Sequence, residues 1–175
     1  MHSYNSQISL RNLPFIFILF TTIFLTGCGF HLKHNNGLVE KFPEIYLDTD
    51  DPKGELTRLV KVRLRGANIN ILTIPKDDAA ILHLDPERRT ERTISLYANA
   101  QNAEKEVGYT LHYSIKMPNY TAKEFDVNLY RDFLDDSSEA LAKSREAELL
   151  TTELRGIAAD HILATMLSIE HGKAE

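Results

Sequence analysis

Val107-Gly108-Tyr109-Thr110-Leu111-His112-Tyr113-Ser114-Ile115-Lys116 places a large apolar side chain at every second position. Successive side chains of a β-strand point to opposite faces, so this pattern predicts a strand with one buried face and one solvent-facing face. Pro118-Asn119 breaks the pattern, and residues 125–130 then resume it. The two segments therefore predict an antiparallel pair of strands at the centre of the fold.

Shorter segments on the N-terminal side of this pair also have strand character. Residues 44–48, 69–74 and 80–84 alternate or are rich in β-branched side chains. The last of these segments continues as residues 90–97, with a bend or bulge at Pro86. The middle of the chain is thus expected to be a β-meander.

Two helices are predicted on either side of this meander. The first should cover residues 52–65, because Asp51-Pro52 has helix-start chemistry, apolar side chains follow at helical spacing, and Gly66 suits a helix end. The second should follow a capping Asp136 and run to about residue 169. Gly156 and the polar stretch 143–146 are the points where its early part could be interrupted.

The order of these elements predicts the fold class. With a further short strand at residues 30–33, the order is β-β-α-β-β-β-β-α. Both helices should pack on one face of a mostly antiparallel, four- to five-stranded sheet, which is an α+β fold. Residues 28–175 are the length of one domain with its own core.

The N-terminus has the pattern of an export signal. An apolar run over residues 13–25 is too short to cross a bilayer as a helix, and it ends in Leu25-Thr26-Gly27-Cys28. This stretch resembles the bacterial lipobox, in which cleavage leaves an acylated cysteine. We therefore predict a signal peptide over residues 1–27 and a lipid anchor on Cys28.

Cys28 is the only cysteine, so its acylation leaves no thiol for a disulfide, a metal or a nucleophile. Two or more acyl chains make membrane attachment stable without an apolar span. Gly29 follows the cysteine, where an aspartate would signal retention in the inner membrane. The outer membrane is thus the expected location.

Several stretches in their order resemble one family of lipoproteins. They are Cys28-Gly29-Phe30-His31-Leu32-Lys33, Asp51-Pro52-Lys53-Gly54, Arg131-Asp132-Phe133-Leu134-Asp135 and Ala140-Leu141-Ala142-Lys143. The chain is similar in these features to the lipopolysaccharide-assembly lipoproteins, the LptE family. The resemblance implies an α/β roll that sits as a plug in the lumen of the outer-membrane barrel LptD, which inserts lipopolysaccharide into the outer leaflet.

Lipopolysaccharide is anionic, whereas the chain has a net charge of −5, so binding would require local cations. The resemblance implies a ligand contact for Lys143, with Arg92 or Lys105 replacing a basic residue that some members have in the hairpin connector. Two clusters of cations are visible, and solvated surface is the alternative interpretation of each. They are Arg58, Lys61 and Arg65 on one helix face, and Arg88, Arg89 and Arg92 near the bend.

The sequence contains no motif typical of an enzyme, and its histidines lack the spacing of metal ligands. We therefore expect a binding protein with no cofactor, no metal and no nucleic-acid partner. Two other hypotheses remain open at this point. One is an independent, periplasm-facing lipoprotein that binds cell wall or carbohydrate, and the other is a divergent hydrolase.

Overall fold

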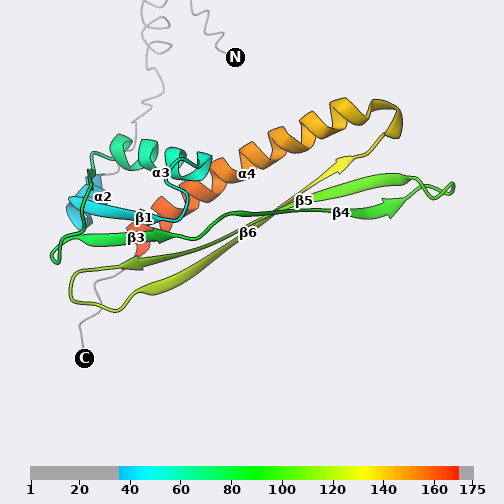
Figure 1. Cartoon of the computed structure of the whole chain (residues 1–175). Coiled ribbons are helices and arrows are strands. Elements are labelled where there is room, and N and C mark those ends of the chain that lie inside the picture. The colour runs from blue at the N-terminus through cyan, green and yellow to red at the C-terminus, as the bar shows by residue number, and fades with distance from the viewer. Residues whose placement is uncertain (1–35, 170–175) are drawn as a thin grey trace, which may run out of the picture. The chain divides into compact units, whose positions relative to one another are not determined.

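The computed structural model describes residues 36–169 (Figure 1). The predicted signal peptide, the anchor Cys28 and the expected strand at residues 30–33 lie outside these residues. The elements in chain order are α2 (Asn36–Lys41), β1 (Glu44–Thr49), α3 (Glu55–Gly66), β2 (Asn70–Leu72), β3 (Ala80–Leu84), β4 (Arg88–Leu96), β5 (Asn102–Lys116), β6 (Lys123–Leu134), the 3₁₀ turn η2 (Ser137–Glu139) and α4 (Ala140–Ser168).

The sheet is built around β5. β6 runs antiparallel to β5 along most of its length, which confirms the predicted central pair. On the opposite edge of β5, β4 pairs with its first part and β3 with its last part, so the chain bends between β3 and β4 as predicted at Pro86. β1 lies between β2 and β3 and is parallel to both.

The α+β fold class is confirmed, but the expected four- to five-stranded sheet is wrong: the described residues already form six strands, with two parallel pairs. β1 and β2 are parallel because α3 carries the chain across the sheet between them, and such a crossover returns the next strand in the same direction. The chain then passes to the other side of β1, where β3 also runs parallel to it. The β1–α3–β2 unit therefore joins a small parallel region to the larger antiparallel one.

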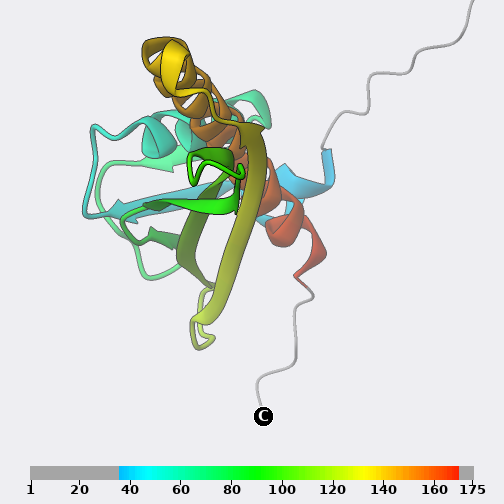
Figure 2. The same cartoon turned by 90° about the vertical axis from the view of Figure 1, so that its right-hand side faces the viewer.

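The two faces of the sheet differ in character. The odd-numbered residues of β5 from Val107 to Ile115 are almost fully buried on the face that α4 covers, and α3 packs beside α4 on the same side (Figures 1 and 2). No helix of residues 36–169 covers the opposite face, which carries mainly polar side chains (Figures 1 and 2). Both predicted helices thus lie on one face. The short α2 packs against the end of α4, where the Lys41 ammonium donates to the backbone oxygens of Leu167 and Ile169.

The first predicted helix begins later than expected. Helix α3 starts at Glu55, because residues 51–54 form a turn in which the Gly54 N–H donates to the Asp51 carbonyl at 3.1 Å. The Thr57 hydroxyl donates to the same carbonyl at 2.7 Å, which ties this turn to the first turn of the helix. At the other end Gly66 is still helical, and the left-handed conformation falls on Asn68, with φ of 61°.

The terminal helix is continuous where an interruption was considered. Helix α4 runs over 29 residues through both Gly156 and the polar stretch 143–146. Its buried side chains, among them Leu154, Ala158 and Ile162, pack on the sheet and α3, and this burial outweighs the roughly 1 kcal/mol helix cost of one glycine. Asp136 caps its approach as predicted, accepting from the Ser138 N–H at 2.8 Å.

The strand boundaries also differ from the expected ones. β2 covers only three residues of the predicted segment 69–74, whereas β5 and β6 are both longer than the alternating patterns indicated. β4 covers residues 88–96 where 90–97 was expected, with register shifts near its end between Thr93 and Leu96. No helix within residues 36–169 has the length and apolar character to cross a membrane.

Candidate functional site

Two neighbouring cavities lie between α4 and the strands below it. The first, of about 320 Å³, is lined by Arg89, Glu91, Lys105, Phe133, Asp135, Asp136, Ser137, Ala140, Lys143, Ser144 and Ala147. The second, of about 430 Å³, is lined by Glu55, Glu87, Arg89, Glu148, Thr151, Thr152 and Arg155. Because Arg89 lines both, we treat them as one feature, the α4–β4 groove.

The groove exists because α4 presents small side chains to the sheet. Ala140, Ser144, Ala147 and Thr151 recur at spacings of three or four residues, which places them on one side of the helix. Because these side chains are short, open space remains between the first half of α4 and the strands. In the second half larger residues, such as Leu154 and Ile162, are fully buried.

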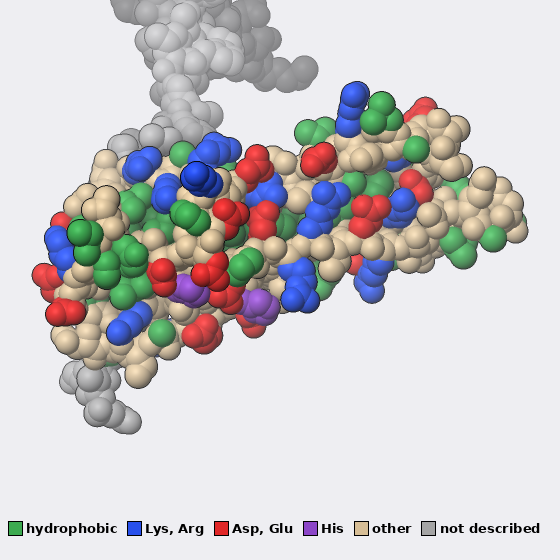
Figure 3. Space-filling view, in the orientation of Figure 1, with side chains coloured by type: hydrophobic (Ala, Val, Ile, Leu, Met, Phe, Trp, Pro, Cys, Tyr) green, Lys and Arg blue, Asp and Glu red, His purple; other side chains and the backbone are tan. Residues whose placement is uncertain are grey.

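Two of the cations predicted from the sequence come together in the groove. Lys105 on β5 and Lys143 on α4 line the same cavity, together with Arg89 on β4. Figure 3 shows basic and acidic side chains side by side in the space between α4 and the strands. The structure thus brings together three cations from three different elements.

Each of these cations already has a carboxylate neighbour. Lys105 Nζ lies 3.3 Å from Glu91 Oε1 and 3.2 Å from Asp135 Oδ2, and Lys143 Nζ lies 3.0 Å from Glu146 Oε2. The bond to Asp135 raises the pKa of Lys105, and the bond to Glu146 raises the pKa of Lys143, so both ammonium groups stay charged at neutral pH. An anionic ligand would have to share these cations with the carboxylates.

Arg92 lies on the other side of the sheet. It pairs in register with Glu106, and its Nε donates to the Glu106 carboxylate at 2.7 Å. Arg89 faces the groove, opposite the buried Tyr109, and an offset of three residues along a strand places Arg92 on the opposite face. Lys105, Lys143 and Arg92, the three ligand contacts expected from the sequence, therefore do not form a single cluster.

The basic cluster on α3 is also remote from the groove. Arg58 and Arg65 are exposed, and neither forms an ion pair with any carboxylate in the described part of the chain. Neither they nor Lys61 lines either cavity. The positions of these cations agree with the alternative interpretation, in which the cluster is solvated surface.

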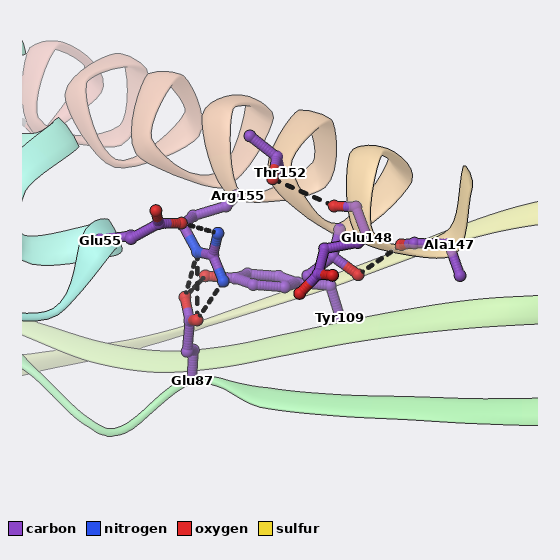
Figure 4. A network of polar contacts seen from close by, with 8 residues as sticks. Glu55, Glu87, Tyr109, Ala147, Glu148, Thr152 and Arg155 are labelled. Atoms are coloured by element: carbon purple, nitrogen blue, oxygen red, sulfur yellow. Dashed lines mark hydrogen bonds and ion pairs between the residues drawn. The ribbon is translucent and has the colours of Figure 1, made fainter. Parts of the chain in front are cut away.

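A polar network closes the inner end of the groove (Figure 4). Arg155 on α4 points down to Glu87, in the link between β3 and β4, with Nη2 at 2.6 Å from Oε1. Its Nη1 donates to Glu55 at the start of α3, and the Tyr109 hydroxyl donates to Glu87 at 2.7 Å. The network joins α3, α4 and the sheet, and only 12% of the Arg155 side chain is exposed.

The network sets the charge states of its members. Burial raises the pKa of Glu87, but the hydrogen bonds from Arg155 and Tyr109 outweigh this effect and hold that pKa below its usual value. Burial and the hydrogen bond to Glu87 raise the pKa of Tyr109 far above its usual value. At neutral pH the network is an ion pair with a neutral tyrosine as donor, an arrangement suited to structural support.

No local pattern in the sequence indicates this network. Glu87 and Arg155 are 68 residues apart, and neither belongs to a motif. Within residues 36–169 no group of three or more His, Cys, Asp or Glu side chains is arranged to hold a metal ion. The groove itself is lined by paired charges and small side chains.

The fold defines the chain as a small α+β domain with a charged groove between a long helix and a sheet. Comparison with known proteins gives the family. The chain belongs to the LptE family, described as lipopolysaccharide-assembly, whose model matches residues 42–166. The resemblance drawn from the sequence is thereby confirmed.

Related proteins agree with this assignment. The chain is 30% identical over 162 residues to an LPS-assembly lipoprotein LptE of Pectobacterium atrosepticum, covering 91% of this chain and 88% of that protein. It is 30% identical over 144 residues to the LptE of Yersinia enterocolitica, covering 82% and 70%. A crystal structure of the rare lipoprotein B from Shewanella oneidensis matches with a TM-score of 0.68 and 40% identity, over 71% of this chain and 94% of that one.

Proposed function

We propose that this protein is an outer-membrane lipoprotein subunit of the lipopolysaccharide translocon. In this proposal it is anchored through Cys28, assists assembly of an LptD-like β-barrel, plugs that barrel and binds lipopolysaccharide during insertion into the outer leaflet. The observation that carries the binding part is the meeting of Lys105 and Lys143 in the α4–β4 groove. Its mechanism is binding without turnover.

The geometry of the groove supports anion binding by exchange of partners. The first cavity is lined by three cations and three carboxylates, so it has no net attraction for an anion at a distance. The pair between Lys143 and Glu146 is an i,i+3 contact on a helix, which contributes only about 0.2–0.5 kcal/mol. Lys143 can therefore leave Glu146 for a phosphate at small cost.

The open face of the sheet supports the plug part of the proposal. Along β5, the side chains of Thr110, His112 and Ser114 lie on this face, opposite the polar residues Asn128, Asp126 and Glu124 of β6. The lumen of a large outer-membrane barrel is polar and hydrated, so a domain inside it needs such a face. Arg92 lies on this face as well and remains a separate candidate for a ligand contact.

Two measurements test the proposal. Affinity purification of the tagged protein from detergent-solubilised outer membrane should recover a large β-barrel protein. Purified Lys143→Asp and Lys105→Asp variants should retain less lipopolysaccharide than the wild type, whereas Arg58→Asp, a charge reversal on α3, should match the wild type. Recovery without any barrel, together with normal surface lipopolysaccharide after deletion, would favour the independent carbohydrate-binding lipoprotein instead.

A further inference from the structure

We propose that the outer edge of β4 is a docking site for an extended, acidic segment of a partner protein, which adds to the sheet as a further strand beside the α4–β4 groove. This inference concerns a contact with protein and does not depend on lipopolysaccharide binding. It rests on the hydrogen-bonding edge, the charges of β4 and the space under α4.

The backbone of β4 has a free edge. Among the described strands, β4 pairs only with β5 and ends the sheet on that side. The pairing is regular from Arg88 to Thr93, and every residue of this segment is exposed. A regular, exposed edge presents unpaired N–H and C=O groups, and an added strand satisfies them.

The charges of β4 select the chemistry of the partner. Its side chains include Arg88, Arg89 and Arg92 but only one acid, Glu91. Arg88 forms no ion pair with any carboxylate of residues 36–169. Opposite charges on neighbouring strands attract, so the edge favours a strand that carries Glu or Asp.

The other long edge of the sheet has the opposite preference. β6 has three acids, Glu124, Asp126 and Asp132, against two cations, Lys123 and Arg131. An acidic segment would be repelled there and attracted to β4. A second copy pairing β4 with β4 would bring arginines together, so self-association through this edge is disfavoured.

The groove supplies room for the side chains of such a segment. Arg89 and Glu91 belong to β4 and also line the first cavity, so the groove borders this edge. A strand added about 4.8 Å outside β4 would direct every second side chain toward α4. The small side chains Ala140 and Ser144 leave space on that side.

A synthetic peptide tests the site on the full chain purified in detergent. The probe is a fluorescein-labelled nonapeptide, Thr-Glu-Val-Glu-Val-Glu-Val-Glu-Thr. One control peptide has Lys in place of every Glu, and a second has Pro at the central position, which removes a backbone donor and disfavours a continuous strand. Binding is measured by fluorescence anisotropy, and backbone amide exchange locates the contact.

The acidic peptide should bind, and its addition should slow amide exchange within residues 88–93. The lysine and proline peptides should bind much more weakly. Arg88→Glu should weaken the acidic peptide by about fivefold, whereas Arg88→Lys and the α3 control Arg58→Glu should not change its affinity.

Three results would overturn the proposal. Equal binding of the proline peptide would show that charge alone, without strand formation, causes the attraction. Protection on α3 or β6 would place the contact elsewhere. If the wild-type chain self-associates and Arg88→Glu abolishes this association, a second copy of the chain occupies the edge. None of these results involves lipopolysaccharide, so the proposed function is tested separately.

Discussion

Arg155 and Glu87 form a two-point ion pair that connects the long helix to the bend between β3 and β4, with Nη2–Oε1 at 2.6 Å and Nε–Oε2 at 2.8 Å. Their positions in the chain are far apart, and their contact closes the inner end of the α4–β4 groove. The Tyr109 hydroxyl joins the pair from the buried face of β5.

Arg155→Met should lower the free energy of unfolding by about 2 kcal/mol, because Glu87 would keep its charge in a partly buried position without its partner. Urea denaturation measures this loss. The matched control is Arg63→Met, which breaks an ion pair with Asp160, whose side chain is 66% exposed. The control should cost less than 1 kcal/mol, as roughly expected of a surface pair. Equal losses in the two variants would contradict the structural role of the network.

His83 should make stability depend on pH. Burial favours the neutral ring, but hydrogen bonds to Asp48 at 2.9 Å and to Asp85 at 3.0 Å outweigh it and raise the pKa of His83. A raised folded-state pKa means that protonated His83 stabilises the fold. This stabilisation is complete below the ordinary histidine pKa of 6.5 and is lost as pH rises through the folded-state pKa.

Denaturation of wild type and His83→Gln at a series of pH values from about 5.5 to 8.5 spans the histidine transition. The difference in stability between the two should shrink as pH rises. A constant difference across the series would show that His83 contributes by packing alone.

Gly108→Ala should destabilise the protein by roughly 1–3 kcal/mol, as over-packing does. A Cβ at this position of β5 would collide with the Thr90 hydroxyl on β4, and the Tyr130 ring on β6 would lie 3.3 Å away. The double variant Gly108→Ala/Thr90→Ala should recover most of the lost stability, measured by thermal unfolding against Thr90→Ala alone. Failure of this rescue would assign the cost to Tyr130 instead.

Lys143→Ala should leave stability within about 0.5 kcal/mol of the wild type, because within residues 36–169 its ion pair is an i,i+3 contact with Glu146 on the helix surface. Lipopolysaccharide retention should fall, most clearly at low ionic strength, and it should fall further in Lys143→Asp. Thermal unfolding measures the stability of the variants, and a pull-down with purified lipopolysaccharide measures their retention of the ligand. Undiminished retention by folded Lys143→Asp would remove this lysine from the proposed site.

Cys28→Ser should block lipidation, because the acceptor of the acyl group is a thiol. Metabolic labelling with radioactive palmitate should mark the wild type and leave the variant unlabelled and unprocessed. A version exported by a different, non-lipoprotein signal should still join the barrel if protein contacts dominate the association. Equal labelling of Cys28→Ser and wild type would refute the anchor assignment.

Much of the antiparallel region could be predicted from local patterns. Alternation in residues 107–116 and 125–130 identified β5 and β6, because side-chain direction in a strand has a period of two. The same rule separates Arg89 from Arg92, since an odd offset places their side chains on opposite faces. Arg88, Arg89 and Arg92, which are close together in the sequence, therefore do not form one cluster on the sheet.

The local chemistry of the chain thus accounts for the alternating strands, the Asp136 cap and the apolar stripe of α4, each of which depends on neighbours a few residues away. The parallel pairing of β1, the continuity of α4 through Gly156 and the meeting of Lys105 with Lys143 depend on tertiary structure. So does the Arg155–Glu87 pair. These contacts join residues distant in the chain, and their energies exist only once the helices have packed on the sheet, so no local period or motif encodes them.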